Sequence, residues 1–281
     1  MPTAARLRFH LADTGTTPAG RIHEAAEIKG GPGTGWDRPR YFPVRAMVLL
    51  VQGGGVYRDT RGTEARLGPG DLLLVSPELG HCYGPGEGQD WHEYYATFEG
   101  ALFDALETCG VLDPARPLWR LGDPRPWRER FIRLFPPPGP GGSRPNAHEQ
   151  LGGLTSFLLA AAEQCPTPVP AAGAPAWLAH ATGLLAAPGE EAADLRKVSK
   201  TCGLGYESFR KQFTALIGES PAAYRRQVLI ARAQRLMRER NLPDRAIAAA
   251  LGFCDEFHFS KTFKRVAGAS PRVWRTRHLS G

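Results

Sequence analysis

The same residue pattern occurs twice near the C-terminus of this 281-residue chain, fifty positions apart. A register of eight matching positions is too long to arise by chance, so the repeat predicts one structural unit that the chain uses twice. The two copies are Phe209-x-Lys211-x-Phe213, Gly218, Ser220-Pro221, Tyr224-Arg225 and Phe259-x-Lys261-x-Phe263, Gly268, Ser270-Pro271, Trp274-Arg275.

Each copy has the spacing of an amphipathic helix. Phe209, Phe213 and Leu216 fall at i, i+4 and i+7, so they share one helical face, which we expect to be core. The opposite face is polar and we expect it to point outward. It carries Glu207, Arg210, Lys211 and Thr214.

Short helical segments precede both copies. Asp194–Lys200 and Asp244–Ala250 are followed by Cys202-Gly203 and Leu251-Gly252, and glycine at a helix C-terminus permits the tight turn of a helix-turn-helix. Ser-Pro then supplies the cap and the first residue of the next helix. The pattern therefore predicts two helix-turn-helix units.

The positive charge of the chain is concentrated in this C-terminal part. The formal net charge is +7. Residues 176–281 hold 18 Lys and Arg against 9 Asp and Glu, whereas residues 1–175 hold 17 against 19. The asymmetry favours a polyanion-binding C-terminal half. Nucleic acid is favoured over a membrane surface, because no basic helix here has a broad apolar face.

The N-terminal half has the strand and turn spacing of a small barrel or sandwich between Val44 and Phe98. Helix-forming segments follow at Leu102–Cys109, Trp127–Phe135 and His148–Glu163. The last of these carries an apolar stripe that suits either a dimer seam or packing against its own barrel. The stripe consists of Leu151, Leu154, Leu158 and Ala161.

The cysteine pattern indicates a reducing compartment, and the hydropathy of the chain argues against export and against a membrane span. The five cysteines form no CxxC pair, which argues against a disulfide framework or a zinc cluster. The N-terminus has no apolar signal core, and no stretch reaches the roughly 18 apolar residues of a membrane span. We expect a cytoplasmic protein without membrane contact, cofactor or bound metal.

At the repeat, the chain resembles the AraC/XylS family of transcription regulators, over about residues 177–277. The resemblance is strongest from Ala248-x-x-x-Gly252-Phe253 to Gly268-x-Ser270-Pro271. It implies seven helices, with a long central helix at about 222–239 between the two units. It also implies that the two recognition helices enter successive major-groove segments of double-stranded DNA, about 34 Å apart.

The resemblance also implies roles for individual residues. Arg and Lys donate to guanine, Glu accepts from cytosine, and Phe257 suits a thymine methyl or a staple of the turn. The family's central-helix arginine is replaced by Leu229, and its capping serine by Gly205. The base-reading candidates are Glu207, Ser208, Arg210 and Lys211 in the first unit and Glu256, Phe257, Ser260 and Lys261 in the second. Lys200, Lys264 and Arg265 are the candidate phosphate contacts.

Two N-terminal motifs resemble the cupin-like effector domain of the same family, particularly its arabinose-regulator branch. They run from Gly70 to Tyr83 and from Trp91 to Phe98. The resemblance implies a barrel that holds a small effector, with a sugar as the expected class. The candidate effector-binding residues are Arg38, His81, Tyr83, Glu93 and Tyr95. An exposed loop arginine and ordinary core tyrosines remain open readings for Arg38, Tyr83 and Tyr95.

The sequence bears on three alternative functions. A metal-dependent cupin enzyme needs a His-x-His pair and a glutamate, and His81 alone cannot hold a metal. The adaptive DNA-repair protein that shares this DNA-binding domain needs a metal-held reactive cysteine, and no cysteine here has clustered partners. An effector-independent DNA-binding protein with a vestigial barrel stays open.

The expected fold class is therefore two-domain, with an N-terminal all-β cupin-like barrel with appended helices and a C-terminal all-α double helix-turn-helix. We expect the barrel at 1–112, a helical dimerisation segment at 113–165, a proline-rich linker at 166–175 and the DNA-binding domain at 176–281. Expected partners are double-stranded DNA, a monosaccharide effector, a second copy in a homodimer, and RNA polymerase.

Overall fold

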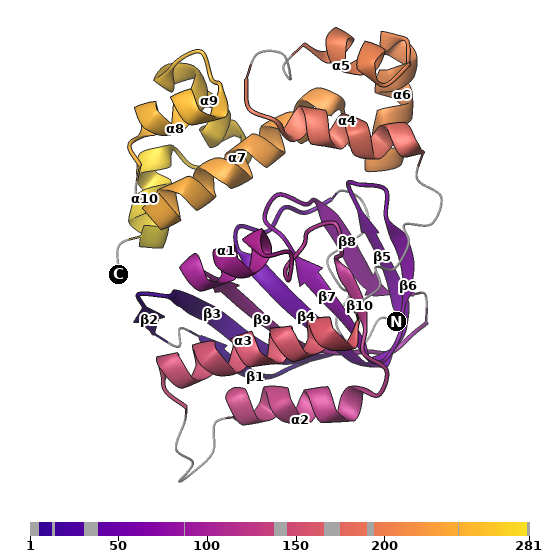
Figure 1. The fold of residues 1–281 in the computed structure, drawn as a ribbon, viewed down its shortest axis with the longest axis vertical. Coiled ribbons are helices and arrows are strands. Elements are labelled where there is room, and N and C mark those ends of the chain that lie inside the picture. The colour runs from indigo at the N-terminus through magenta and orange to yellow at the C-terminus, as the bar shows by residue number, and fades with distance from the viewer. Residues whose placement is uncertain are drawn as a thin grey trace.

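The chain folds into a β-rich half followed by a helical half (Figure 1). The computed structural model describes residues 6–12, 15–30, 39–86, 88–137, 145–165, 175–189, 194–240 and 242–279. This division confirms the expected two-domain fold class. The strands are β1 (Arg6–Ala12), β2 (Thr16–Thr17), β3 (Gly20–Lys29), β4 (Arg45–Gly53), β5 (Gly55–Asp59), β6 (Glu64–Leu67), β7 (Asp71–Val75), β8 (His81–Pro85), β9 (Trp91–Glu99) and β10 (Leu118–Arg120).

Two antiparallel sheets form the N-terminal half. The larger has the order β1-β3-β9-β4-β7-β10, with β2 paired to β3, and the smaller has the order β6-β5-β8. One apolar cluster contains Val48 and Leu50 of β4 together with Tyr57 of β5 and Tyr83 of β8, so the sheets pack face to face. The region expected to form strands, between Val44 and Phe98, contains β4, β5, β6, β7, β8 and most of β9.

Strand β4 is apolar from Ala46 to Val51 because both of its faces are buried there. Successive side chains of a strand point to opposite faces. Val48 and Leu50 face the smaller sheet, whereas Met47 and Leu49 belong to a second cluster on the other face. The continuous apolar sequence therefore reflects a sheet that is covered on both sides.

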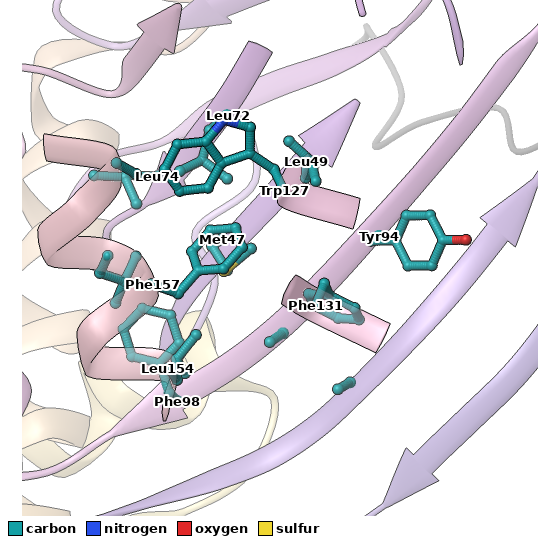
Figure 2. Packing of buried hydrophobic residues seen from close by; sticks show 14 of the residues in the cluster. Met47, Leu49, Leu72, Leu74, Tyr94, Phe98, Trp127, Phe131, Leu154 and Phe157 are labelled. Atoms are coloured by element: carbon teal, nitrogen blue, oxygen red, sulfur yellow. The ribbon is translucent and has the colours of Figure 1, made fainter. Parts of the chain in front are cut away.

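Helices α1 (Ala101–Thr108), α2 (Pro124–Leu134) and α3 (Ala147–Gln164) cover the outer face of the larger sheet. Figure 2 shows Trp127 and Phe131 of α2 and Leu154 and Phe157 of α3 packed over the sheet residues. Trp127 meets Phe157 edge to face, with ring centroids 5.1 Å apart. The three expected N-terminal helices are thus present within three residues of their expected ends.

The apolar stripe of α3 packs inside its own domain. Leu151, Leu154, Leu158 and Ala161 are all buried in the cluster that α2 and the larger sheet share. Of the two open readings for the stripe, packing on the protein's own sheet is therefore the one that the fold realises. Strand β10, within the segment expected to be helical, pairs with β7 and extends the same sheet.

The described residues from 175 onward form seven helices, as expected: α4 (Ala176–Ala186), α5 (Leu195–Thr201), α6 (Tyr206–Ile217), α7 (Pro221–Arg240), α8 (Asp244–Leu251), α9 (Glu256–Ala267) and α10 (Pro271–Leu279). The long α7 contributes Tyr224 and Val228 to one core and Leu229 and Ile230 to another. The expected linker at 166–175 lies outside the described residues, apart from Pro175.

One core expectation for α6 is wrong. Leu216 is 44% exposed, whereas its neighbour Ile217 is 3% exposed and packs with Phe209 and Phe213. Residues 209, 213 and 217 are spaced by four, and their positions drift by only about 40° per step around a helix. This drift places Ile217 on the buried side and turns Leu216 toward its edge.

Candidate nucleic-acid interface and ligand site

Two helix pairs, α5–α6 and α8–α9, form the expected helix-turn-helix units. Gly203 follows α5 and Gly252 follows α8, and each has a φ of 72°. Residues with a side chain pay about 1–2 kcal/mol in this left-handed region, so glycine is the residue that the turn favours. At Gly252 a Cβ atom would also lie 2.4 Å from the backbone nitrogen of Gly189.

The repeated aromatic residues make the same contacts in both units. In the first, Phe213 lies 5.6 Å from Phe209 and 5.6 Å from Tyr224 between ring centroids. In the second, Phe263 lies 5.7 Å from Phe259 and 6.0 Å from Trp274. The sequence repeat is therefore a repeat of packing, with each recognition helix held on the helix that follows it.

The arginine that ends each repeat fixes its helix to an earlier segment. Arg225 is buried and donates to the carbonyl oxygens of Leu185, Ala187 and Gly189 at 2.6 to 2.9 Å. Arg275 donates to the Leu242 carbonyl oxygen and, at 2.8 Å, to Asp244 Oδ1. Ser220 and Ser270 cap α7 and α10 through their hydroxyl oxygens, as expected.

All four reading candidates of α6 are exposed: Glu207, Ser208, Arg210 and Lys211. Arg210 donates to Glu207 Oε2 at 3.0 Å, and Gln212 donates to Ser208 Oγ at 2.8 Å. Within the described residues, Lys211 has no ion pair. It lies opposite the buried Phe209, Phe213 and Ile217, on the outward side of α6.

The second unit presents a similar face on α9. Phe257 is 87% exposed, Glu256 and Lys261 are exposed, and Ser260 is half-buried. The staple of this turn is Phe253 rather than Phe257, since the Phe253 ring packs edge to face on Phe259 at 5.3 Å. Exposure at this level leaves Phe257 available to a partner.

The candidate phosphate contacts are positively charged side chains that form no ion pair with another described residue. Lys200 of α5 and Lys264 and Arg265 of α9 are exposed, and none forms an ion pair with another described residue. Exposed cations around a recognition helix are the side chains that neutralise phosphates. Lys261, Lys264 and Arg265 give α9 a stronger positive face than α6.

Among the exposed side chains of these faces, Gln212, Thr214 and His258 were not expected readers. The fifty-residue register pairs Phe209 with Phe259, so it also pairs Ser208 with His258. Following that register through every position of α9 would have identified His258, whereas Glu256 corresponds to Tyr206.

The candidate ligand site lies between the two sheets. Trp91, Glu93 and Tyr95 alternate along β9 and point to the same face as Tyr83 of β8. Trp91 Nε1 donates to Glu93 Oε2 at 2.8 Å. Glu93 is 5% exposed, and burial raises the pKa of its carboxyl to about 7.

Burial also governs the tyrosines and the histidine of this region. It raises the pKa of Tyr83 and of Tyr95. His81 is 3% exposed, its Nδ1 donates to the Leu79 carbonyl oxygen at 3.1 Å, and burial lowers its pKa to about 4. His81 also stacks on Tyr83 with centroids 6.1 Å apart. The fifth candidate, Arg38, lies outside the described residues.

The described part of the chain offers neither a metal-binding cluster nor a membrane span. Its His, Cys, Asp and Glu side chains do not assemble into a group of three that suits a metal ion. None of its helices has the length and hydropathy to span a membrane. The five cysteines are free thiols.

Side chains of α7 connect the two halves of the molecule, and Figure 1 shows α7 between the sheets and the helix-turn-helix units. Glu78 accepts from Arg232 Nε at 2.6 Å and lies 3.1 Å from the Arg235 guanidinium. Arg238 pairs with Glu99 and donates to the Pro43 carbonyl oxygen. These arginines are spaced by three residues and therefore lie along one side of α7.

A second contact between the halves lies near the start of α7. The Tyr41 hydroxyl donates to Glu219 Oε1 at 2.7 Å, and the Tyr41 ring packs against the first helix-turn-helix core. Burial raises the pKa of Tyr41 and of Glu219. The N-terminal half thus contacts the helical half at both ends of α7.

Comparison with known proteins matches both halves of the chain. A family described as an AraC-like ligand binding domain matches residues 31–135. A family described as a helix-turn-helix domain matches residues 198–277. The two matches follow the order of the two observed halves.

Individual proteins that are similar to this chain share a modest fraction of its residues. The chain is 24% identical over 247 residues to the MmsAB operon regulatory protein of Pseudomonas aeruginosa, covering 84% of this chain and 76% of that protein. It is 37% identical over 82 residues to the HTH-type transcriptional activator RhaR of Cronobacter sakazakii, covering 29% of each. A solved structure of apo ToxT from Vibrio cholerae is similar over 92% of this chain and 97% of its own, with 10% identity and a TM-score of 0.40.

Proposed function

Because the chain belongs to the AraC family of transcription regulators, we propose that α6 and α9 read specific sequences in successive major-groove segments on one side of a duplex. The observation that carries this proposal is the repetition of one exposed face. Lys211 and Lys261 occupy equivalent positions on the two helices, both are exposed, and neither has an ion pair among the described residues. Lysine in the major groove donates to guanine N7 and O6.

The remaining candidates divide by chemistry. Besides the two lysines, the proposed base readers are Glu207, Ser208, Arg210, Glu256, Phe257 and Ser260. Arg210 must give up its exposed ion pair with Glu207 before it contacts a base. Exposed pairs of this kind contribute only about 0–1 kcal/mol, so the loss is small. Lys200, Lys264 and Arg265 neutralise phosphates and so set affinity rather than sequence preference.

The effector is a small molecule bound between the sheets, with a sugar as the proposed class. Glu93 and the hydroxyls of Tyr83 and Tyr95 supply donors and acceptors for sugar hydroxyls. The ring faces of Tyr83 and Trp91, 6.1 Å apart between centroids, suit the C–H surface of a pyranose. Arg38 and His81 complete the proposed set.

The effector acts by changing how the helix-turn-helix units are held. Support comes from the ion pairs of Glu78 and Glu99 with α7, since Glu78 lies in the turn between β7 and β8, and Tyr83 lies on β8. A ligand that binds two arrangements of the halves with different affinity shifts their populations. The regulator acts in the cytoplasm as a homodimer, with RNA polymerase as a further partner.

Selection from a random duplex pool tests the DNA-binding part of the proposal. The full-length protein is expected to enrich a motif with two segments about one helical turn apart, and Lys211→Ala and Lys261→Ala are expected to weaken different segments. Enrichment of no motif would contradict sequence-specific binding. Loss of the same segment in both variants would contradict the assignment of one segment to each unit.

A thermal-shift screen of monosaccharides and polyols tests the effector. A sugar that binds between the sheets is expected to raise Tm for the unmodified protein and to lose that effect in Glu93→Gln. Glu64→Gln, at an exposed position of strand β6, is the matched control and is expected to keep the shift. A flat response across the library would favour an effector-independent DNA-binding protein.

A further inference from the structure

His258 lies on the reading face of α9 and is engaged by neither the proposed base contacts nor the proposed phosphate contacts. It is exposed, and it precedes Lys261 by three residues and Arg265 by seven. Residues at i, i+3 and i+7 share one side of a helix, so these three side chains form a single outward stripe. Through the repeat register His258 also occupies the position of Ser208 on α6.

Three contacts hold His258, one through its backbone and two through its ring. Its backbone nitrogen donates to Asp255 Oδ1 at 2.6 Å, which anchors the first turn of α9. Its ring meets Phe253 edge to face, with centroids 5.5 Å apart at 75°. Its Nδ1 lies 3.3 Å from Cys254 Sγ. An exposed side chain held at these points keeps one orientation and loses little rotamer freedom when a partner binds.

The Cys254 contact determines which atom of the imidazole is available. The Cys254 thiol has one hydrogen and two acceptors within reach, His258 Nδ1 at 3.3 Å and Asp255 Oδ2 at 3.7 Å. Because Nδ1 is the nearer acceptor, the thiol hydrogen is assigned to it. With Nδ1 accepting, the neutral ring carries its hydrogen on Nε2, and the doubly protonated ring carries one there as well. Nε2 is a donor in both forms.

We propose that His258 is a further base-reading residue of the second unit, whose Nε2–H donates to guanine N7 or O6 in the major groove. Cys254 is a positioning residue that orients the ring. The proposal rests on the proposed reading of DNA by α9. Guanine is the base that presents only acceptors on this edge of a purine, whereas adenine presents a donor beside N7.

The geometry favours His258 over Glu256 as the partner of Lys261. Glu256 precedes Lys261 by five residues, which places it about 140° away around the helix, whereas His258 is only about 60° away. His258 and Lys261 therefore approach neighbouring base pairs from one side of α9. Glu256 lies nearer the edge of the interface.

The experiment is selection from a random duplex pool with the full-length protein and four variants, followed by titration of the selected duplex. The wild-type chain is expected to enrich a guanine in the segment assigned to α9. His258→Ala is expected to lose preference at that base pair alone, with about 3- to 10-fold weaker binding to the selected duplex. Binding to duplexes that lack the guanine is expected to stay unchanged.

His148→Ala is the matched control. His148 is exposed in the first turn of α3, and its backbone nitrogen donates to the capping Asn146 at 3.0 Å, as that of His258 does to Asp255. This variant is expected to select the wild-type motif with wild-type affinity. Circular dichroism of all variants establishes that each one is folded.

Cys254 has its own pair of variants. Cys254→Ala is expected to weaken the preference at the same base pair, and Cys254→Ser is expected to restore it, because a hydroxyl also donates to Nδ1. A Cys254→Ala variant with full preference would overturn the positioning role.

The remaining outcomes separate the inference from the proposed function. An unchanged motif and affinity for His258→Ala would overturn the inference. So would an equal loss on every duplex, since that is the behaviour of a phosphate contact. If the wild-type chain enriches no motif at all, the proposed function fails first and the inference fails with it.

Discussion

Glu78, in the turn between β7 and β8, accepts a hydrogen bond of 2.6 Å from Nε of Arg232 on α7, 154 residues further along the chain. The same carboxylate lies 3.1 Å from the guanidinium of Arg235. Both pairs are less than one third exposed. A charge-assisted contact in such a site contributes more than a fully exposed ion pair. The turn therefore holds α7 against the N-terminal half.

Removing this charge is expected to loosen the contact between the halves. Glu78→Gln keeps the shape of the side chain but loses the ion pairs, at a cost of about 1 kcal/mol. Amide hydrogen exchange in α7 is expected to become roughly fivefold faster, while exchange in the β4 core stays the same. Glu64→Gln breaks the exposed pair with Arg58 and serves as the control. Equal protection of α7 in both variants would contradict the role given to Glu78.

The two equivalent lysines are expected to contribute to affinity without contributing to folding. Lys211→Ala and Lys261→Ala are each expected to weaken binding of the selected duplex by about 1–3 kcal/mol. Their unfolding midpoints are expected to match the unmodified protein, because both side chains are exposed and unpaired within the described residues. Arg133→Ala on α2 removes an exposed charge from the other half and is the control. A gel-shift titration with unchanged affinity would refute the assignment.

Glu93 is expected to make the stability of the N-terminal half depend on pH. Burial raises the pKa of its carboxyl from 4.5 to about 7 in the folded protein. The folded state therefore binds the proton more tightly, and stability from this group falls as pH rises between about 4.5 and 7. The loss above pH 7 is on the order of 3 kcal/mol. Glu93→Gln cannot ionise and is expected to lack this decline.

Urea unfolding of the two proteins at pH 5 and pH 8 measures the Glu93 effect. The difference in stability between Glu93→Gln and the unmodified protein is expected to grow toward pH 8 in favour of the variant. A difference that stays constant with pH would show that the carboxyl ionises in the folded protein as readily as in the unfolded chain.

The two turn glycines are expected to differ in how much they tolerate alanine. Gly203→Ala meets no atom within 4 Å, so its cost is the left-handed backbone alone, about 1–2 kcal/mol. Gly252→Ala pays the same cost and also places Cβ 2.4 Å from the Gly189 nitrogen. Denaturant unfolding is expected to show the larger loss for Gly252→Ala. Equal losses would mean that the segment around Gly189 moves away freely.

The helical half was predictable in detail because the repeat supplies its own internal comparison. The helix starts at Ser220-Pro221 and Ser270-Pro271 and the glycine turns follow from local residue chemistry, whereas the seven helices follow from the family resemblance. The error in this half concerns which residue in the last turn of α6 is buried. The spacing of Phe209, Phe213 and Leu216 favours Leu216 as core, and only the packing distinguishes it from Ile217.

The first strands of the N-terminal half were not predictable in the same way. β3 contains a register shift between Ile22 and Glu24, and Ala25 and Ala26 are both fully buried, so the strand lacks a clean alternation of polar and apolar residues. A bulge of this kind depends on the neighbouring strand β9 and leaves no local signal.

Contacts between the halves lie beyond sequence reasoning for a different reason. Nothing in the residues around Glu78 distinguishes it from other acidic residues, and its partners depend on how the two folded halves pack together.

The ligand site could be predicted in part. Tyr83, Glu93 and Tyr95 do lie at one region between the sheets, but the depth of burial of Glu93 depends on the smaller sheet that covers it.

Helix α7 belongs to both helix-turn-helix cores at once, through Tyr224 and Val228 in one and Ile230 and Met237 in the other. Its 20 residues span about 30 Å, close to one turn of a duplex. The distance between α6 and α9 is therefore set by the length of one helix within a single chain. Under the proposed coupling, a displacement of α7 by the N-terminal half would reorient both helix-turn-helix units together and leave the distance between them unchanged.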